Sequence, residues 1–169
     1  MKKRAQGFSL IEVLVSVLIM AVGILGVAGM QVVSLQQNRN ALLRDQALQA
    51  GNDILDRMYA NPLSTYSPVL ITDVPVSNMN CIDSVCDRNE MAEFDIAQWK
   101  CRLNPLDADG EVYEVCAGFS LSKVSLPGGQ GSISKTGLLY EISVIWMRDQ
   151  SGNTSSITLR AQTEDTHDP

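Results

Sequence analysis

Glu12 is a charged residue in a segment where burying a charge costs free energy. Glu12 lies four residues beyond Phe8, inside a run of apolar residues. A charged carboxylate at the centre of a membrane helix costs about 2.5–3.5 kcal/mol, and less near the interface, so such residues usually have a function. The chemistry open to Glu12 is an ion pair in weakly polar surroundings, where attraction is poorly screened and an unpaired charge is heavily penalised. The alternative is a side chain that merely extends to the lipid headgroups.

The second chemical group consists of four cysteines, Cys81, Cys86, Cys101 and Cys116. Four cysteines allow three pairings, and we favour the two local bridges, Cys81–Cys86 and Cys101–Cys116. The spacing, with four intervening residues and then two gaps of 14, matches a zinc site poorly. A redox-active pair with two intervening residues is absent. Disulfides are the expected state if this region lies in an oxidising compartment.

Several other function classes lack their residues. The formal charge is −6, and three of the 13 basic residues are at positions 2–4, so binding to a nucleic acid backbone is not expected. The single histidine, His167, leaves little material for acid–base or metal chemistry. Residues 107–111 and 127–131 only faintly resemble a calcium loop and a phosphate loop, and turns are expected there. The sequence therefore predicts no enzyme activity, no cofactor and no metal.

The element that would hold Glu12 is an apolar helix. From Val13 to Met30, Ser16 is the only polar side chain, and these 18 residues would span roughly 27 Å as a helix, close to a bilayer core. A cleaved signal peptide or a plain membrane anchor would share the basic start and the apolar run. Glu12 and the unbroken continuation into a polar helical pattern argue against both. With the basic end inside, the residues after the helix would be periplasmic.

The N-terminal segment Gly7-Phe8-Ser9-Leu10-Ile11-Glu12 resembles the class III signal of type IV prepilins and type II secretion pseudopilins. The resemblance implies that a prepilin peptidase cuts between Gly7 and Phe8 and methylates the new N-terminal Phe8. It also implies that Glu12 sets the register of assembly. Physically, the freed amine of Phe8 is a cation that Glu12 of a staggered neighbouring helix can meet in a water-poor filament core.

The chain is expected to have an α+β fold, with a long helix at 8–60 followed by a head at 61–169. The prepilin resemblance implies that residues 1–7 are a leader. Residues 8–33 would form the transmembrane or filament-core part of the helix, and the rest is amphipathic. The predicted buried stripe of that helix consists of Leu35, Leu43, Ala47, Ala50, Ile54 and Met58. The head is expected to have an irregular connection at 63–89, a short helix at 90–103, and strands at 112–124, 132–134, 138–148 and 154–163. These strands would form an antiparallel sheet that packs on the long helix.

The head carries a second resemblance. Ala92-x-x-Asp95-x-x-x-Trp99, the turn Leu126-Pro-Gly-Gly-x-Gly and the strand pattern Tyr140-x-Ile-x-Val-x-Trp146 are similar to the PilV family of type IV minor pilins, also called type IV pilus modification proteins. The stretch 104–118 is not part of that pattern.

The PilV resemblance implies a non-enzymatic pilin that sits in the inner membrane before assembly and in the pilus or at its tip afterwards. Its expected partners are other minor pilins, the major pilin, the prepilin peptidase and the inner membrane, with a tip adhesin as a further candidate. A type II secretion pseudopilin is the alternative within the same architecture. A DNA-binding minor pilin is the alternative from another class, and it lacks a basic head: residues from Asn61 onward contain 7 Lys and Arg against 15 Asp and Glu.

Overall fold

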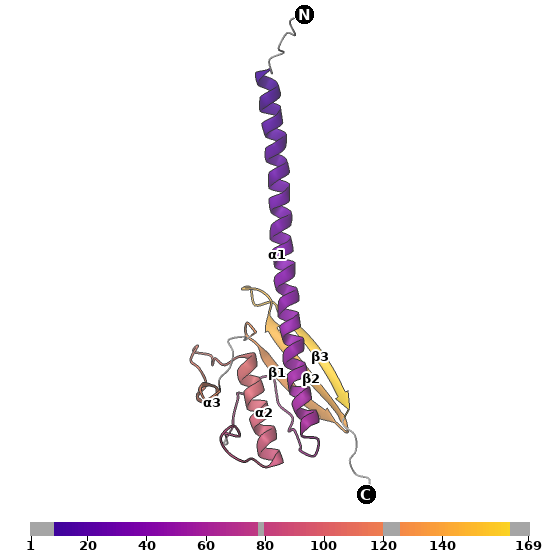
Figure 1. Ribbon diagram of the computed structural model, residues 1–169, viewed down its shortest axis with the longest axis vertical. Coiled ribbons are helices and arrows are strands. Elements are labelled where there is room, and N and C mark those ends of the chain that lie inside the picture. Colours follow the sequence, from indigo (N-terminus) through magenta and orange to yellow (C-terminus); the bar gives the residue numbers. More distant parts are fainter. Residues whose placement is uncertain (1–8, 78–79, 120–125, 163–169) are drawn as a thin grey trace, which may run out of the picture. The chain divides into compact units, whose positions relative to one another are not determined.

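The computed structural model describes residues 9–77, 80–119 and 126–162. Its elements are α1 (Leu10–Ala60), α2 (Arg88–Leu103), α3 (Glu114–Ala117), β1 (Gln130–Thr136), β2 (Leu139–Met147) and β3 (Thr154–Gln162) (Figure 1). The chain divides into two compact units, Met1–Ala41 and Leu42–Pro169, and α1 is one continuous helix that contributes to both. The predicted long N-terminal helix is therefore present.

The second unit has its core between the C-terminal part of α1, helix α2 and one face of the sheet (Figure 1). Four residues of the predicted stripe on α1 are buried, namely Leu43, Ala47, Ile54 and Met58. Ala50 is only partly buried. Leu35 does not belong to this stripe: it is 68% exposed and lies in the first unit, where the described part of α1 has no residues packed on it.

Gly51 is a buried residue that the hydrophobic pattern did not predict. A Cβ atom at this position would lie 2.6 Å from Leu159 Cδ1, so the missing side chain lets β3 approach the helix closely. A glycine inside a helix costs about 1 kcal/mol relative to alanine. Close packing against the sheet explains why a glycine occurs at this position in the helix.

The sheet has three antiparallel strands in the order β1-β2-β3. Along β2, Tyr140, Ile142, Val144 and Trp146 are buried, whereas the residues between them point to the opposite, partly exposed face. The predicted alternation of this strand is therefore confirmed. A long apolar N-terminal helix followed by a small antiparallel sheet confirms the predicted α+β class and is consistent with a type IV pilin fold.

Helix α2 begins with a reciprocal cap. The Asp87 carboxylate accepts hydrogen bonds from the backbone N–H groups of Asn89 and Glu90, and the Glu90 carboxylate accepts one from the Asp87 N–H. This capping box satisfies N–H groups that have no partner within the helix. It explains why the helix starts two residues before the predicted residue 90.

The predicted strand at 112–124 is wrong where the structure describes it. Residues Glu114–Ala117 form the single helical turn α3, and 120–124 lie outside the described residues. The N–H groups of Cys116 and Ala117 both donate to the Tyr113 carbonyl. Cys116 is bonded to Cys101, and Phe119 packs edge-on against Phe94 at 5.3 Å between ring centroids. These contacts hold the segment on α2. Strand formation depends on the neighbours available for pairing, so an alternating pattern alone does not make this segment a strand.

Lys100 joins α2 to the connection that follows α1. Its side chain is buried, and its ammonium donates a hydrogen bond of 2.8 Å to the Leu70 carbonyl. Asp73 is the charged group that favours protonation of this ammonium. Burial outweighs Asp73 and lowers the pKa of Lys100 to about 8.

We predict that Lys100→Met changes the pH dependence of folding. Between pH 8 and 10.5 the unfolded chain binds a proton at Lys100 that the folded chain has lost, so this group makes the wild-type protein more stable as pH rises. The effect is about 1 kcal/mol for each pKa unit. Denaturation of the solubilised protein at pH 7 and pH 10 measures it. The wild-type protein should gain stability relative to Lys100→Met at pH 10, and a parallel response of the two proteins would contradict this burial effect.

Candidate assembly site

The N-terminal end of α1 places Glu12 in the first turn of the helix. The Ser9 carbonyl accepts hydrogen bonds from the N–H groups of Glu12 at 3.0 Å and Val13 at 3.3 Å. A carboxylate in this turn is favoured by the helix dipole. Gly7 and Phe8, the predicted cleavage and methylation residues, lie outside the described residues.

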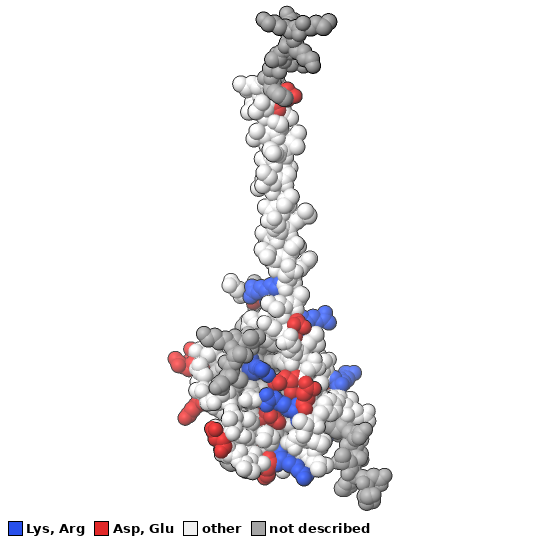
Figure 2. All heavy atoms as spheres, viewed as in Figure 1, with Lys and Arg blue, Asp and Glu red and all other residues white. Residues whose placement is uncertain are grey.

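The described part of the first unit exposes an apolar helix surface. All its residues from Ser9 to Ala41 are exposed, and α1 contains a segment long and apolar enough to cross a membrane. No charged residue occurs between Glu12 and Arg39, and Figure 2 shows an uncharged stretch of α1 before charged side chains gather on the second unit. An apolar surface of this extent indicates contact with lipid or with other proteins.

Two polar side chains in this segment, Ser16 and Glu12, differ in whether the helix itself provides a bonding partner. The Ser16 hydroxyl donates a hydrogen bond of 2.8 Å to the Val13 carbonyl one turn earlier. Glu12 has no ion pair with any residue that the structure describes. Ser16 can therefore enter apolar surroundings with its donor paired, whereas Glu12 needs a partner from elsewhere.

Three glycines, Gly23, Gly26 and Gly29, interrupt the large side chains of this segment. A Cβ atom at any of them would meet no described atom within 4 Å. Contacts within the described chain therefore do not explain them. Small residues allow two helix backbones to approach closely, which fits a helix that packs against other helices.

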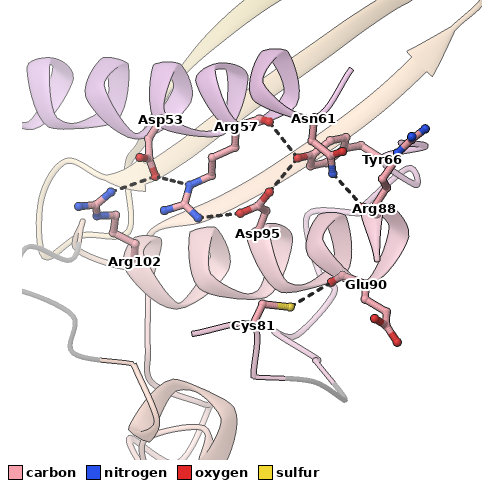
Figure 3. A network of polar contacts seen from close by, with 9 residues as sticks. All are labelled: Asp53, Arg57, Asn61, Tyr66, Cys81, Arg88, Glu90, Asp95 and Arg102. Carbon is pink, nitrogen blue, oxygen red and sulfur yellow. Dashed lines mark hydrogen bonds and ion pairs between the residues drawn. The ribbon is translucent and has the colours of Figure 1, made fainter. Parts of the chain in front are cut away.

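At its other end, α1 is tied into the second unit by a network of charges (Figure 3). Arg57 of α1 donates to Asp95 of α2 at 2.8 Å between Nη1 and Oδ1. Asp53 of α1 lies 3.4 Å from Arg57 Nε and 2.9 Å from Arg102 Nη1. Asp95 is only 6% exposed, so its charge depends on these partners. The network joins the last turns of α1 to one side of α2.

Tyr66 and Trp99 complete the connection. The Tyr66 hydroxyl lies 2.8 Å from Asp95 Oδ2 and 3.1 Å from the Arg57 carbonyl oxygen. Burial, followed by the hydrogen bond to Asp95, raises the pKa of Tyr66 well above its usual value, so the hydroxyl keeps its proton. The buried Trp99 indole donates a hydrogen bond of 2.8 Å to the Ala50 carbonyl. Asp95 and Trp99, two residues of the predicted family pattern, therefore both act between α2 and α1.

The cysteines form two disulfides, Cys81–Cys86 and Cys101–Cys116, which is the pairing favoured from the sequence. The first closes a short loop before α2, and the second joins α2 to α3 rather than to the predicted strand. Within the described ranges, no group of three or more His, Cys, Asp or Glu residues is arranged to hold a metal ion. Asp107 instead caps its own turn, because its carboxylate accepts from the N–H groups of Asp109 and Glu111.

We predict that Asp95→Leu destabilises the second unit. Arg57 would keep Asp53 but lose its shortest partner in a largely buried position, so we expect a loss of about 2–3 kcal/mol, below the about 3–5 kcal/mol typical of a fully buried pair. Asp95→Asn is the matched control, because it keeps a hydrogen-bonding side chain of the same shape and should lose less. Denaturant unfolding of the solubilised protein measures both. Wild-type stability of Asp95→Asn would contradict a role for the charge.

Comparison with known protein families gives a match at the N-terminus. Residues 2–28 match the model of the prokaryotic N-terminal methylation motif. The match covers the basic start, Gly7, Phe8, Glu12 and most of the exposed apolar segment. Neither the curated proteins nor the solved structures contain a significant match. Together with the long apolar helix and the small antiparallel sheet, the motif supports a type IV pilin-like prepilin, a structural protein that is processed by a prepilin peptidase and associates with other pilus components.

Proposed function

We propose that the protein is a minor pilin of the PilV family that helps to prime or modify type IV pilus assembly. The observation that carries the proposal is the exposed apolar half of α1 with Glu12 as its one charge, placed behind a matched N-terminal methylation motif. Before assembly this segment spans the inner membrane once, with the head in the periplasm. In the pilus, or at its tip, the same surface packs against the helices of other pilins.

The proposed mechanism begins with removal of residues 1–7. Cleavage after Gly7 creates a new amine at Phe8, which is then methylated. In the lipid, Glu12 lies near the membrane surface, where its charge is least costly. In a filament, the Phe8 amine of this chain or of a neighbour pairs with Glu12, and an unpaired charge in that core is penalised. The ion pair therefore selects the axial register of the packed helices.

The head contacts support assignment to the PilV family. In the turn that starts at Leu126, a Cβ atom at Gly129 would lie 2.5 Å from the Leu103 carbonyl oxygen, and one at Gly131 would lie 2.4 Å from the Trp99 ring. The Trp99 ring therefore fits against this turn only because Gly131 has no side chain. Trp99 in turn bonds the Ala50 carbonyl of α1. The separate parts of the family pattern meet in one packed cluster, which gives their joint occurrence a physical reason.

Two other assignments remain as alternatives. A type II secretion pseudopilin would share the N-terminal segment, but we expect a smaller head without the glycine-rich turn. A DNA-binding minor pilin would need a basic head, whereas the acidic residues from Asn61 onward outnumber the basic ones. Co-purification of the solubilised protein from its own cells separates the alternatives, since type IV minor pilins, secretion pseudopilins and DNA would each identify one.

We predict that the mature protein begins at Phe8 and that its N-terminal residue carries a methyl group. The reason is the Gly7-Phe8 junction after a leader with three basic residues. Mass spectrometry of the N-terminal peptide measures both modifications. Gly7→Ala should leave most of the protein uncleaved. A mature N-terminus between residues 20 and 40 would instead indicate an ordinary signal peptide.

We predict that Glu12→Leu separates processing from assembly. Cleavage at Gly7 should continue, and the unassembled protein should accumulate in the membrane because a burial cost of about 2.5 kcal/mol or less is removed. Its amount in sheared pili should fall, since the Phe8 amine loses its partner. Immunoblots of membranes and sheared pili, at matched expression, measure the two pools.

Glu12→Gln is the matched control for shape. It keeps a polar side chain of the same size but removes the charge, so it should also assemble poorly. Normal assembly of Glu12→Gln with poor assembly of Glu12→Leu would mean that hydrogen bonding, and not charge, sets the register. Normal amounts of Glu12→Leu in sheared pili would contradict the proposed role of Glu12.

A further inference from the structure

The two outer edges of the sheet differ in whether they are covered. At the β1 edge, the Val69 N–H donates to the Ile133 carbonyl at 2.8 Å, and the Ile133 N–H donates to the Val69 carbonyl at 2.9 Å. At the β3 edge, no described segment pairs with Thr154–Gln162. An uncovered strand of nine residues is a template for pairing with another chain.

The register identifies which peptide groups of β3 are unpaired. The backbone N–H and C=O groups of Ile133 point to Val69 and therefore away from β2. The corresponding groups of Ile142, the residue of β2 opposite Ile133, point away from β1 and toward Leu159 of β3. Peptide groups alternate in direction along an antiparallel strand. Leu159 therefore bonds inward, and Ser156, Thr158 and Arg160 direct their N–H and C=O groups to the outer edge.

Apolar side chains border this edge on the face that carries α1. Ile157 and Leu159 are only partly buried, and both lie against Gly51. Leu48 and Leu55, three residues before and four residues after Gly51, are partly exposed on that side of the helix, and Tyr59 is 56% exposed. A strand added to β3 would thus satisfy backbone groups and cover apolar surface at once.

We propose that the outer edge of β3 binds a β-strand of a different protein in the assembled complex. This inference rests on the proposed function, because a partner that packs along α1 is brought to this edge. Ile157 and Leu159 of β3 lie against Gly51, so this edge is beside α1 within the second unit.

A second copy of this chain does not fit the edge as an antiparallel strand. Two β3 strands paired antiparallel are related by a two-fold axis that reverses the direction of α1, whereas helices inserted in one membrane with the same topology run the same way. A side-by-side copy in the same direction would offer its β1 edge, and Val69 already occupies that edge at Ile133. Among antiparallel pairings, the occupant is consequently another protein.

The chemistry of the partner strand follows from the residues it would face. Apolar side chains at alternate positions would lie beside Ile157 and Leu159 on the α1 face. On the open face, the residue opposite Arg160 would not be Lys or Arg, because like charges directly opposite each other are destabilising. Arg160 is held by Glu141 at 2.8 Å and keeps its side chain along the sheet.

Photocrosslinking in cells tests the proposal. The photoreactive residue p-benzoylphenylalanine is placed at Ser156 in the full chain, and the same residue at Ser134 on β1 is the control for the other edge. Thr158→Pro then removes one outward N–H group, which an edge strand tolerates without loss of its inward ladder. Thr158→Val is the matched variant, because both replacements remove the hydroxyl contact with Ser143 but only proline removes the N–H.

We expect the Ser156 probe to crosslink to an extended segment with alternating apolar residues in another protein. The yield should be kept in Thr158→Val and should fall about fivefold in Thr158→Pro, the effect of one lost hydrogen bond. Thermal unfolding checks that Thr158→Pro is folded. If it is not, Ser156→Pro with the probe at Arg160 gives the same test, because the Ser156 N–H also points outward.

Three results would overturn the proposal: no crosslink at Ser156, a crosslink that proline leaves unchanged, or a crosslink between two differently tagged copies of this chain. Membranes and sheared pili are probed separately. Protein present in sheared pili without the crosslink contradicts the edge pairing alone. A proline-sensitive crosslink in membranes, with no protein in sheared pili, supports the edge pairing and contradicts the proposed role in the pilus.

Discussion

The exposed apolar surface of α1 between Leu10 and Leu35 is the constraint on which the rest of the molecule depends. Each square ångström of such surface left in water costs about 25 cal/mol, so this helix requires lipid or protein around it. Apolar contact alone does not select one axial position along a neighbouring helix. Glu12 is the only charge in the segment and gives the surface a polar point of reference. In the proposed filament, that single carboxylate converts general adhesion into a defined register.

The same helix must also be held firmly where it enters the second unit. Ala47 and Gly51 have little or no side chain, which lets the sheet approach α1, and Trp99 anchors α2 to the Ala50 carbonyl. Arg57 and Asp95 add a charged contact at the end of the helix. These contacts leave the outer edge of β3 uncovered among the described residues. Rigid attachment on one side and an open edge on the other suit a subunit that binds unlike neighbours.

Much of this architecture could be predicted from the sequence where one period dominates. The apolar run after Phe8 is exposed on all sides where it is described, whereas the stripe from Leu43 to Met58 and the alternation from Tyr140 to Trp146 each bury one face, so pattern and structure agree. The strand predicted at 112–124 failed because Cys116 and Phe119 are held by α2, a tertiary contact that alternation does not reveal. The Arg57–Asp95 pair and the bridge from Val69 to Ile133 join distant residues and left no local pattern.

In the proposed function, the apolar half of α1 exchanges lipid for the helices of other pilins. The most direct measurement places a photoreactive residue at Ile19, which is exposed in the middle of this segment, and compares adducts in membranes and in sheared pili. We expect lipid adducts in the membrane pool and, in sheared pili, crosslinks to the N-terminal helix of another pilin. Lipid adducts alone in both pools, or absence of the processed protein from sheared pili, would contradict it.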